Sequence, residues 1–279
     1  MKWPNGAKIA FSLAFDLDAD TIWRNKAVKL KNGETYLRGL SIGRYSINKG
    51  AYRVLDILKK YNIKATWFIP AEIVQKHTDL VKRIISDGHE IGHHGLDHRG
   101  EYGDTVQKQI SRIEQCNEVF KKNVGIVPVG FRPTGQLLPE TLEWVYSDGG
   151  FIYSSAGISG EECNYYSING KITKAVNIPC RDEQLDDYVQ TVLNSYPQVL
   201  MGMPRIASYK NVYSNWIHEL EGMIKYGNSG STAFHPQIEG TPGRAVMFEL
   251  FIKYLINNPN IWCARCIDIA NYYNKHIGD

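Results

Sequence analysis

Residues 89–98 read His-Glu-Ile-Gly-His-His-Gly-Leu-Asp-His and hold four of the eight histidines in the chain. His94 and His98 are separated by three residues, a spacing that lets two imidazoles converge on one metal ion if the segment turns after a strand. Gly92 and Gly95 permit such a turn, because glycine adopts backbone angles that other residues avoid. The alternative interpretation is a histidine-rich polar loop that binds nothing.

On both sides of this stretch, short apolar runs alternate with segments of helical periodicity. The apolar runs predict strands at residues 8–15, 64–69, 129–133, 151–154, 175–178, 231–235 and 261–264, with the histidine stretch as a further strand. Helical spacing predicts helices at residues 51–58, 72–86, 139–147, 185–196, 216–225, 247–255 and 267–273. A further helix carries Ile110 and Phe120, after a capping box of Asp104 and Gln107. The alternation predicts an α/β fold in which helices wrap a parallel sheet, and 279 residues suit one α/β barrel.

Residues 23–50 show no clear period and predict a long loop. Loops of this length in compact domains are often functional or mobile. Ser41 and Arg44 are therefore candidate substrate-binding residues at the mouth of a site. An ordinary surface excursion is the alternative.

Candidate chemical groups follow the predicted strands. They are Asp16, Asp18, His94, His98, Arg132 and His235. Asp16 and Asp18 are two residues apart on an extended chain, so both carboxylates can face one pocket. In α/β barrels the active site lies at the carboxyl ends of the strands. The shared position of these groups therefore predicts one active site.

The composition is that of an ordinary globular protein. We expect one catalytic domain over residues 1–279. The net charge of +3 argues against nucleic acid as a partner, and no apolar run approaches the length that spans a membrane. The start of the chain lacks the apolar run of a signal peptide, so we expect a cytoplasmic protein. Five cysteines without framework spacing suit a reducing compartment, and Cys263 and Cys266 are expected to be structural thiols.

The ordered motifs resemble those of the polysaccharide deacetylase family. Residues 16–18 look like its first motif, residues 94–98 its second, residues 131–133 its third, and residues 233–235 the place of its catalytic histidine. The resemblance implies a distorted seven-stranded (β/α) barrel. Further similarity, at residues 89–92, 234–244 and 261–270, is to an intracellular branch. That branch includes peptidoglycan deacetylases, allantoinases and cyclic imide hydrolases, often as homo-oligomers.

The resemblance also implies a role for each site residue. Asp16 is the expected general base, and Arg132 supports it. Asp18, His94 and His98 are the expected ligands of one divalent ion. Zinc is the first expectation for that ion, with cobalt, nickel and iron as alternatives.

His235 is expected to protonate the leaving nitrogen, and Pro133 and Thr134 are further candidate substrate-binding residues. Three positions depart from the family pattern: Thr134 stands where an aromatic residue is usual, Ala233 replaces a leucine, and Ser154-Ser155 replaces Asp-Ser. A supporting carboxylate is therefore missing or moved. The candidates to supply it are Glu161, Glu162, Asp186 and Asp187, although surface charge is the preferred interpretation of these four.

These features predict a metal-dependent hydrolase of non-peptide amide bonds. Its first expected substrate is an N-acetylated sugar or polysaccharide. A small cyclic amide, such as an imide or ureide, is the alternative substrate. A carbohydrate-binding barrel without catalysis is a third possibility, but the full set of site residues argues against it.

Overall fold

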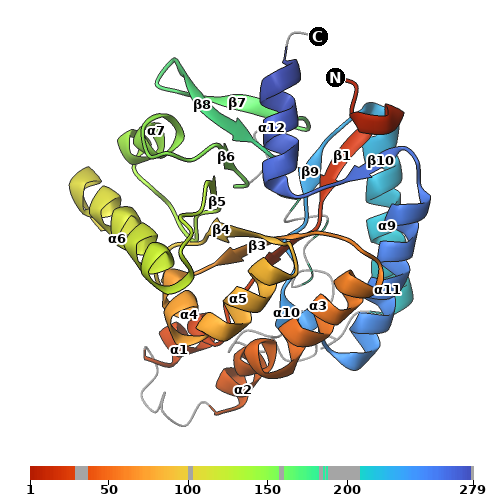
Figure 1. The fold of residues 1–279 in the computed structure, drawn as a ribbon, viewed down its shortest axis with the longest axis horizontal. Coiled ribbons are helices and arrows are strands. Elements are labelled where there is room, and N and C mark those ends of the chain that lie inside the picture. The colour runs from red at the N-terminus through yellow and green to blue at the C-terminus, as the bar shows by residue number, and fades with distance from the viewer. Residues whose placement is uncertain are drawn as a thin grey trace.

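The computed structural model describes residues 1–28, 37–99, 103–156, 160–181, 185, 187 and 208–277. In this part of the chain, strands form two sheets that helices surround (Figure 1). The larger sheet has the order β2 (Ala14–Asp16), β3 (Thr66–Ile69), β4 (Glu90–His93), β5 (Gly130–Phe131), β6 (Tyr153–Ser154), β8 (Lys171–Asn177) and β7 (Asn164–Ile168). The smaller sheet has the order β10 (Ile261–Cys263), β1 (Ile9–Ser12) and β9 (Gly230–Ser231). All pairs are parallel except the hairpin of β7 and β8.

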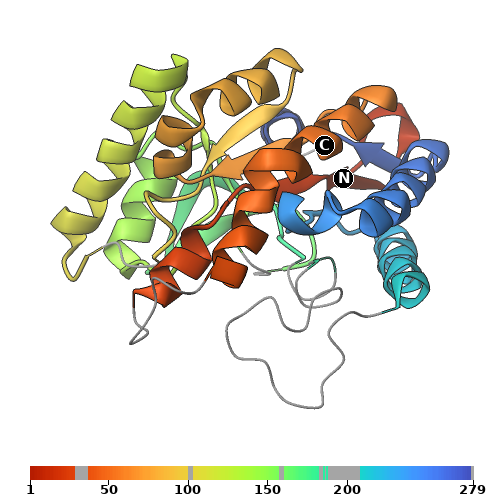
Figure 2. The ribbon, with the colours of Figure 1, turned by 90° about the horizontal axis from the view of Figure 1, so that it is seen from below.

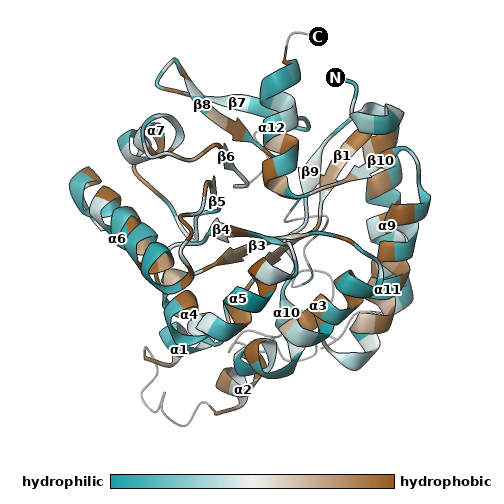
Figure 3. Cartoon of the chain, viewed as in Figure 1, coloured by the Kyte–Doolittle hydropathy of each residue, from teal (hydrophilic) through white to brown (hydrophobic). Residues whose placement is uncertain are grey.

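Several of the helices carry hydrophobic residues on one side and hydrophilic residues on the other, and they bury the hydrophobic side (Figure 3). After the short η1 (Pro4–Gly6), they are α1 (Thr21–Ala27), α2 (Leu37–Tyr45), η3 (Ser46–Gly50), α3 (Ala51–Lys60), α4 (Ala71–Lys76), α5 (Thr78–Ser86), α6 (Val106–Val124), α7 (Pro139–Ser147), α9 (Tyr209–Tyr226), α10 (Pro236–Glu239), α11 (Pro242–Asn257) and α12 (Cys266–His276). Among these described helices, none is both long and apolar enough to cross a membrane.

The core lies between the strands and this layer of helices. Phe15 and Trp67, from neighbouring strands, stack with ring centroids 4.8 Å apart. Trp216 of α9 lies 4.7 Å from Phe234 by the same measure. Burying such large side chains supplies most of the hydrophobic stabilisation. The aromatic core thereby fixes residues 14–16 and 234, which flank the candidate site.

The prediction of an α/β fold with parallel strands and surrounding helices is confirmed, with one correction to the first strand. Residues 8–15 form two strands rather than one, because the chain passes from the smaller sheet to the larger at Leu13. Residue 234 lies beside β2: the Asp16 N–H donates to the Phe234 carbonyl at 2.8 Å. Single parallel bridges, Phe15 to Phe234 and Cys180 to Ser231, join the two sheets. The strands are therefore arranged as a distorted barrel, in which single bridges rather than a continuous ladder of hydrogen bonds join the two sheets.

The prediction of a long loop at residues 23–50 is wrong where the structure describes it. Helices α1, α2 and the π-helical turn η3 occupy most of this segment, and α1 packs against α2 (Figure 2). Residues 29–36 lie outside the described part. A Cβ on Gly50 would stand 2.1 Å from the Pro236 carbonyl oxygen. This glycine therefore permits close backbone packing of η3 on α10 instead of breaking a helix.

Three smaller corrections concern helix ends and one missed strand. The helix expected at residues 72–86 is two helices, α4 and α5, that meet at His77. Thr105, not Asp104, caps α6, since its hydroxyl accepts the Lys108 N–H at 3.3 Å. The polar strand β7 was not predicted, because only its hairpin partner carries an apolar face. The helix expected at residues 185–196 lies outside the described residues except for Leu185 and Asp187.

Candidate active site

Asp18 lies at the centre of the cluster of predicted site residues. It follows β2 and is fully buried. Its two oxygens lie 3.5 Å from His94 Nε2 and 3.5 Å from His98 Nε2, respectively. Neither oxygen has a hydrogen-bond partner among the described residues. Burying an unpaired carboxylate is costly, which is the electrostatic situation that a bound cation relieves.

The donor atoms of Asp18, His94 and His98 fit a divalent metal ion. One donor atom from each residue lies within 4.8 Å of those of the other two. Donors bound at about 2.0–2.2 Å from one ion stand roughly 3–4 Å apart, close to the observed separations. One carboxylate and two imidazoles form a donor set suited to zinc and other first-row divalent ions.

His94 presents the correct nitrogen to this cluster. Its Nδ1–H donates to the Arg132 carbonyl oxygen at 2.8 Å, because a carbonyl can only accept. The lone pair of Nε2 is therefore directed at Asp18. Burial lowers the pKa of His94, which favours the neutral form that binds a metal.

His98 reaches the cluster from a turn with an uncommon backbone conformation. Its φ is +56°, in the left-handed region that non-glycine residues rarely adopt. Gly95, with φ of +73°, makes the turn that was predicted for the end of this strand. Left-handed residues persist where the surrounding structure holds them, and they are concentrated at functional sites.

Asp16 is paired with Arg132 and faces His94. Its Oδ1 accepts from Arg132 Nη1 at 2.6 Å, and its Oδ2 lies 3.8 Å from His94 Nε2. Burial alone would raise the pKa of Asp16, but the charge of Arg132 lowers it below its ordinary value. Asp16 is therefore held as a carboxylate beside the cluster of Asp18, His94 and His98.

Arg132 is buried and held on several sides. Its Nε donates to the Ser155 carbonyl at 3.0 Å, and Nη2 donates to the hydroxyls of Ser155 and Ser231 at 2.9 and 3.1 Å. The guanidinium also lies 4.1 Å from the centroid of the Phe68 ring. This network leaves the guanidinium one position, in which it contacts Asp16.

His235 faces the same cluster from the start of α10. Its Nε2 lies 3.6 Å from Asp18 Oδ2. Its Nδ1–H donates to Asp187 Oδ1 at 2.7 Å, and its backbone N–H donates to Asp187 Oδ2 at 2.5 Å. Asp187 is fully buried, and burial raises its pKa while His235 opposes the shift.

The expectation that Asp187 is surface charge is wrong. It is buried and its carboxylate contacts His235, so it can supply the supporting carboxylate that Ser154 and Ser155 do not. Glu161 and Glu162 are exposed, and Asp186 lies outside the described residues. The sequence contains one signal that could have indicated a buried position for Asp187, namely its place two residues after the apolar Leu185. The 48-residue separation from His235 hides the contact from any local pattern.

The four predicted substrate-binding residues lie in two places, on α2 and directly after Arg132. Ser41 and Arg44 are exposed on α2, and Arg44 Nε pairs with Asp20 Oδ2 at 2.9 Å. Pro133 and Thr134 are half-buried and directly follow Arg132. Their contact with a substrate remains a prediction.

His93, which precedes His94, is packed in the core. Its ring lies 5.1 Å from that of Phe131, and its Nδ1 accepts the Gly95 N–H at 3.1 Å. Burial lowers its pKa to about 3, so it stays neutral. Cys263 and Cys266 have free thiols whose pKa burial raises to about 12, which suits structural thiols.

Comparisons with known proteins agree with the fold and the motifs. Residues 43–153 match the family model described as polysaccharide deacetylase. Over 96% of its length the chain is 23% identical to the peptidoglycan deacetylase of Helicobacter pylori, of which it covers 97%.

Two solved structures share the fold over nearly the whole chain. A protein assigned to the polysaccharide deacetylases from Mycobacterium smegmatis is 24% identical, with a TM-score of 0.85, covering 99% of this chain and 94% of that one. An allantoinase is 21% identical, with a TM-score of 0.80, covering 98% and 93%. The predicted resemblance is thereby confirmed: this chain matches the polysaccharide deacetylase model over residues 43–153 and shares the fold of these two structures.

Proposed function

We propose that the protein hydrolyses a carbon–nitrogen amide bond, and that its substrate is an N-acetylated sugar or polysaccharide. The observation that supports this most directly is the position of Asp18. It lies within 3.6 Å of His94, His98 and His235, with no hydrogen-bond partner for its oxygens among the described residues. The similarity to a peptidoglycan deacetylase over 96% of the chain supports the substrate class.

Asp18, His94 and His98 would hold one divalent ion, and zinc is our proposal for it. When bound, such an ion lowers the pKa of water and polarises an amide carbonyl. Asp16 accepts the proton of the attacking water, because Arg132 keeps it ionised. Arg132 also fixes the direction of that carboxylate through its 2.6 Å hydrogen bond.

His235 protonates the leaving nitrogen through Nε2. The hydrogen bond to Asp187 holds the proton on Nδ1, so that Nε2 faces the cluster. A carboxylate at this place also stabilises the imidazolium that must form before the proton is donated. Asp187 is therefore a positioning residue for His235, with a role that complements that of Arg132 toward Asp16.

Hydrolysis of a small cyclic amide is the second candidate function. Thr134 supports it, because this half-buried residue stands where the resembled family usually carries an aromatic ring beside a sugar. The fold shared with an allantoinase is compatible with it. A binding module without catalysis is less consistent with a complete set of base, acid and metal ligands. A cytoplasmic location and a homo-oligomeric state remain predictions.

The test is a substrate panel with the zinc-loaded protein and its His94→Ala variant. We expect acetate release from N-acetylglucosamine oligomers or peptidoglycan fragments by the wild type alone. Ring opening of imides or ureides without acetate release would favour the second candidate. Absence of both activities in the folded, zinc-loaded protein would contradict the proposal of an amide hydrolase.

A further inference from the structure

Asp97 directly precedes His98 in residues 94–98, here called the metal-binding segment, and its carboxylate contacts Arg99 and Arg112. The Asp97 Oδ2 lies 3.0 Å from Arg99 Nε. Its Oδ1 accepts the backbone N–H of Arg99 at 3.3 Å, which closes a turn around His98. Arg112 of α6 places Nη2 3.1 Å from both carboxylate oxygens. The Asp97 side chain, which closes the turn around His98, is therefore bound to α6, a long helix outside the strand layer.

The two halves of the metal-binding segment are held by different elements. The carbonyls of Gly95 and Leu96 accept the N–H groups of Ala71 and Glu72, at the start of α4, at 2.9 and 2.8 Å. These bonds lie on the His94 side of the turn.

On the His98 side, the carbonyl of Asp97 accepts from Asn25 Nδ2 at 2.9 Å, and its side chain contacts Arg112. His98 itself has φ of +56°, so its conformation depends on such neighbours.

We infer that Asp97 and Arg112 position His98, and that this pair sets the affinity of the site for its divalent ion. The inference rests on the proposed function, because it takes Asp18, His94 and His98 as the ligands. Groups that orient metal ligands typically change affinity by about 10–100-fold when they are removed. The pair touches no metal-binding atom, so its effect must pass through the backbone and ring position of His98.

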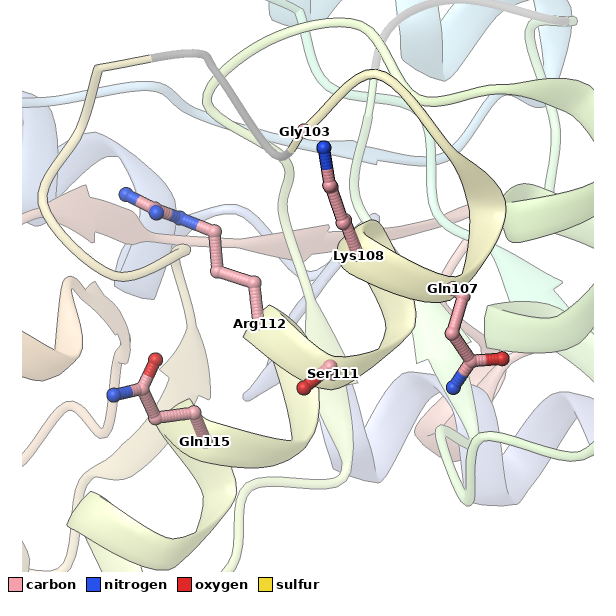
Figure 4. Close-up of a pocket in the computed structure, with 6 residues that line it drawn as sticks. All are labelled: Gly103, Gln107, Lys108, Ser111, Arg112 and Gln115. Carbon is pink, nitrogen blue, oxygen red and sulfur yellow. The ribbon is translucent and has the colours of Figure 1, made fainter.

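The surroundings of Arg112 make it suitable for substitution. It lines an open pocket of about 510 Å³ on α6, together with Gly103, Gln107, Lys108, Ser111 and Gln115 (Figure 4). Its side chain is 29% exposed. Truncation to alanine therefore enlarges an existing pocket rather than opening a cavity in the core, and alanine favours the helix.

The experiment is a double-mutant cycle on Co²⁺ affinity, read from the visible absorption of the bound ion. The variants are Asp97→Asn, Arg112→Ala and the double variant. Arg83→Ala is the matched control, because Arg83 is similarly exposed, at 32%, and pairs with Asp56, which is outside residues 94–98. Circular dichroism and thermal unfolding establish that each variant is folded.

We expect each single variant to bind Co²⁺ about tenfold or more weakly, and the double variant to be no weaker than Asp97→Asn alone. Arg83→Ala should bind as the wild type does. Wild-type affinity in folded Arg112→Ala and Asp97→Asn would overturn the inference while leaving the proposed function intact. A wild type that binds no Co²⁺, or binding that survives His94→Ala, would overturn the metal site and the inference together.

Discussion

The imidazole Nδ1 of His235 lies 2.7 Å from Asp187 Oδ1, while the other Asp187 oxygen accepts the backbone N–H of the same histidine. One carboxylate thus fixes both the ring and the backbone of His235. The contact joins two positions 48 residues apart and directs Nε2 toward Asp18. It is the arrangement in which a histidine can act as a general acid with a defined tautomer.

Asp187→Asn should reduce kcat by about 100-fold or more. The asparagine oxygen would still accept the backbone N–H of His235, so its NH₂ group would face Nδ1. Because an NH₂ group donates, Nδ1 would have to accept, and the tautomer with its proton on Nε2 would be favoured. The measurement is kcat against pH for the wild type, Asp187→Asn and Glu162→Gln. Glu162 is an exposed acid that was an equal candidate for this role, so its variant should leave kcat unchanged. Full activity of Asp187→Asn would remove Asp187 from the site.

Zinc should stabilise the wild type but not an Asp18→Ala variant. A ligand that binds only the folded state at about 100 times its Kd contributes roughly 2.7 kcal/mol. Thermal unfolding with added zinc or with a chelator measures the difference. Because Asp18 contacts both His94 and His98 at 3.5 Å, its loss should abolish the shift. An equal rise in Tm for both proteins would place the zinc elsewhere.

Arg132→Met should shift the acid limb of the pH–rate profile to higher pH. Without Arg132, burial dominates and the pKa of Asp16 rises, so the base is protonated at a higher pH. Stability should fall by about 3–5 kcal/mol, because Asp16 loses its partner in a buried position. Arg181→Met is the control: Arg181 is also buried, but it pairs with Glu219. If both variants lost stability and both kept the wild-type acid limb, Arg132 would have no part in tuning the base.

Glu90→Gln should change how stability depends on pH. Burial raises the pKa of Glu90 from its ordinary 4.5 to about 7, against opposing hydrogen bonds from Tyr153, Ile267 and Thr66. The folded state binds the Glu90 proton more tightly than the unfolded state does. The stability that Glu90 contributes is therefore complete below pH 4.5 and is lost as the pH rises through 7.

The comparison is urea unfolding of the wild type and Glu90→Gln at pH 5 and at pH 8.5. From pH 5 to pH 8.5 the free energy of unfolding of the wild type should fall by on the order of 3 kcal/mol relative to that of the variant. Glu90 begins β4 and accepts the Ile267 N–H, whereas His94 follows the opposite end of that strand, so kcat at pH 7 should stay nearly constant. A stability difference independent of pH would contradict the raised pKa.

The sequence allowed most of the barrel and most of the site to be predicted, because both leave local patterns. Apolar runs mark strands, and Asp16, Asp18, His94 and Arg132 each follow such a run. Parallel strands end on one side of a sheet, so the convergence of these groups follows from local positions alone.

The missed features depend on contacts between distant segments. Residues 9–16 are all buried, so the run carries no sign that the chain changes sheets at Leu13. The helical character of residues 37–50 depends on packing against α10, where Gly50 and Gly240 approach too closely for a side chain. Asp187 pairs with His235 across 48 residues, and its charge alone indicated a surface position.

The central claim is that a metal held by Asp18, His94 and His98 is required for amide hydrolysis. The most direct measurement removes bound metal with a chelator, restores zinc in steps, and records bound zinc and acetate release in parallel. We predict that acetate release returns in proportion to zinc up to about one ion per chain, and that His94→Ala recovers neither binding nor release. Full acetate release from the metal-free protein, or from folded His94→Ala, would contradict the account.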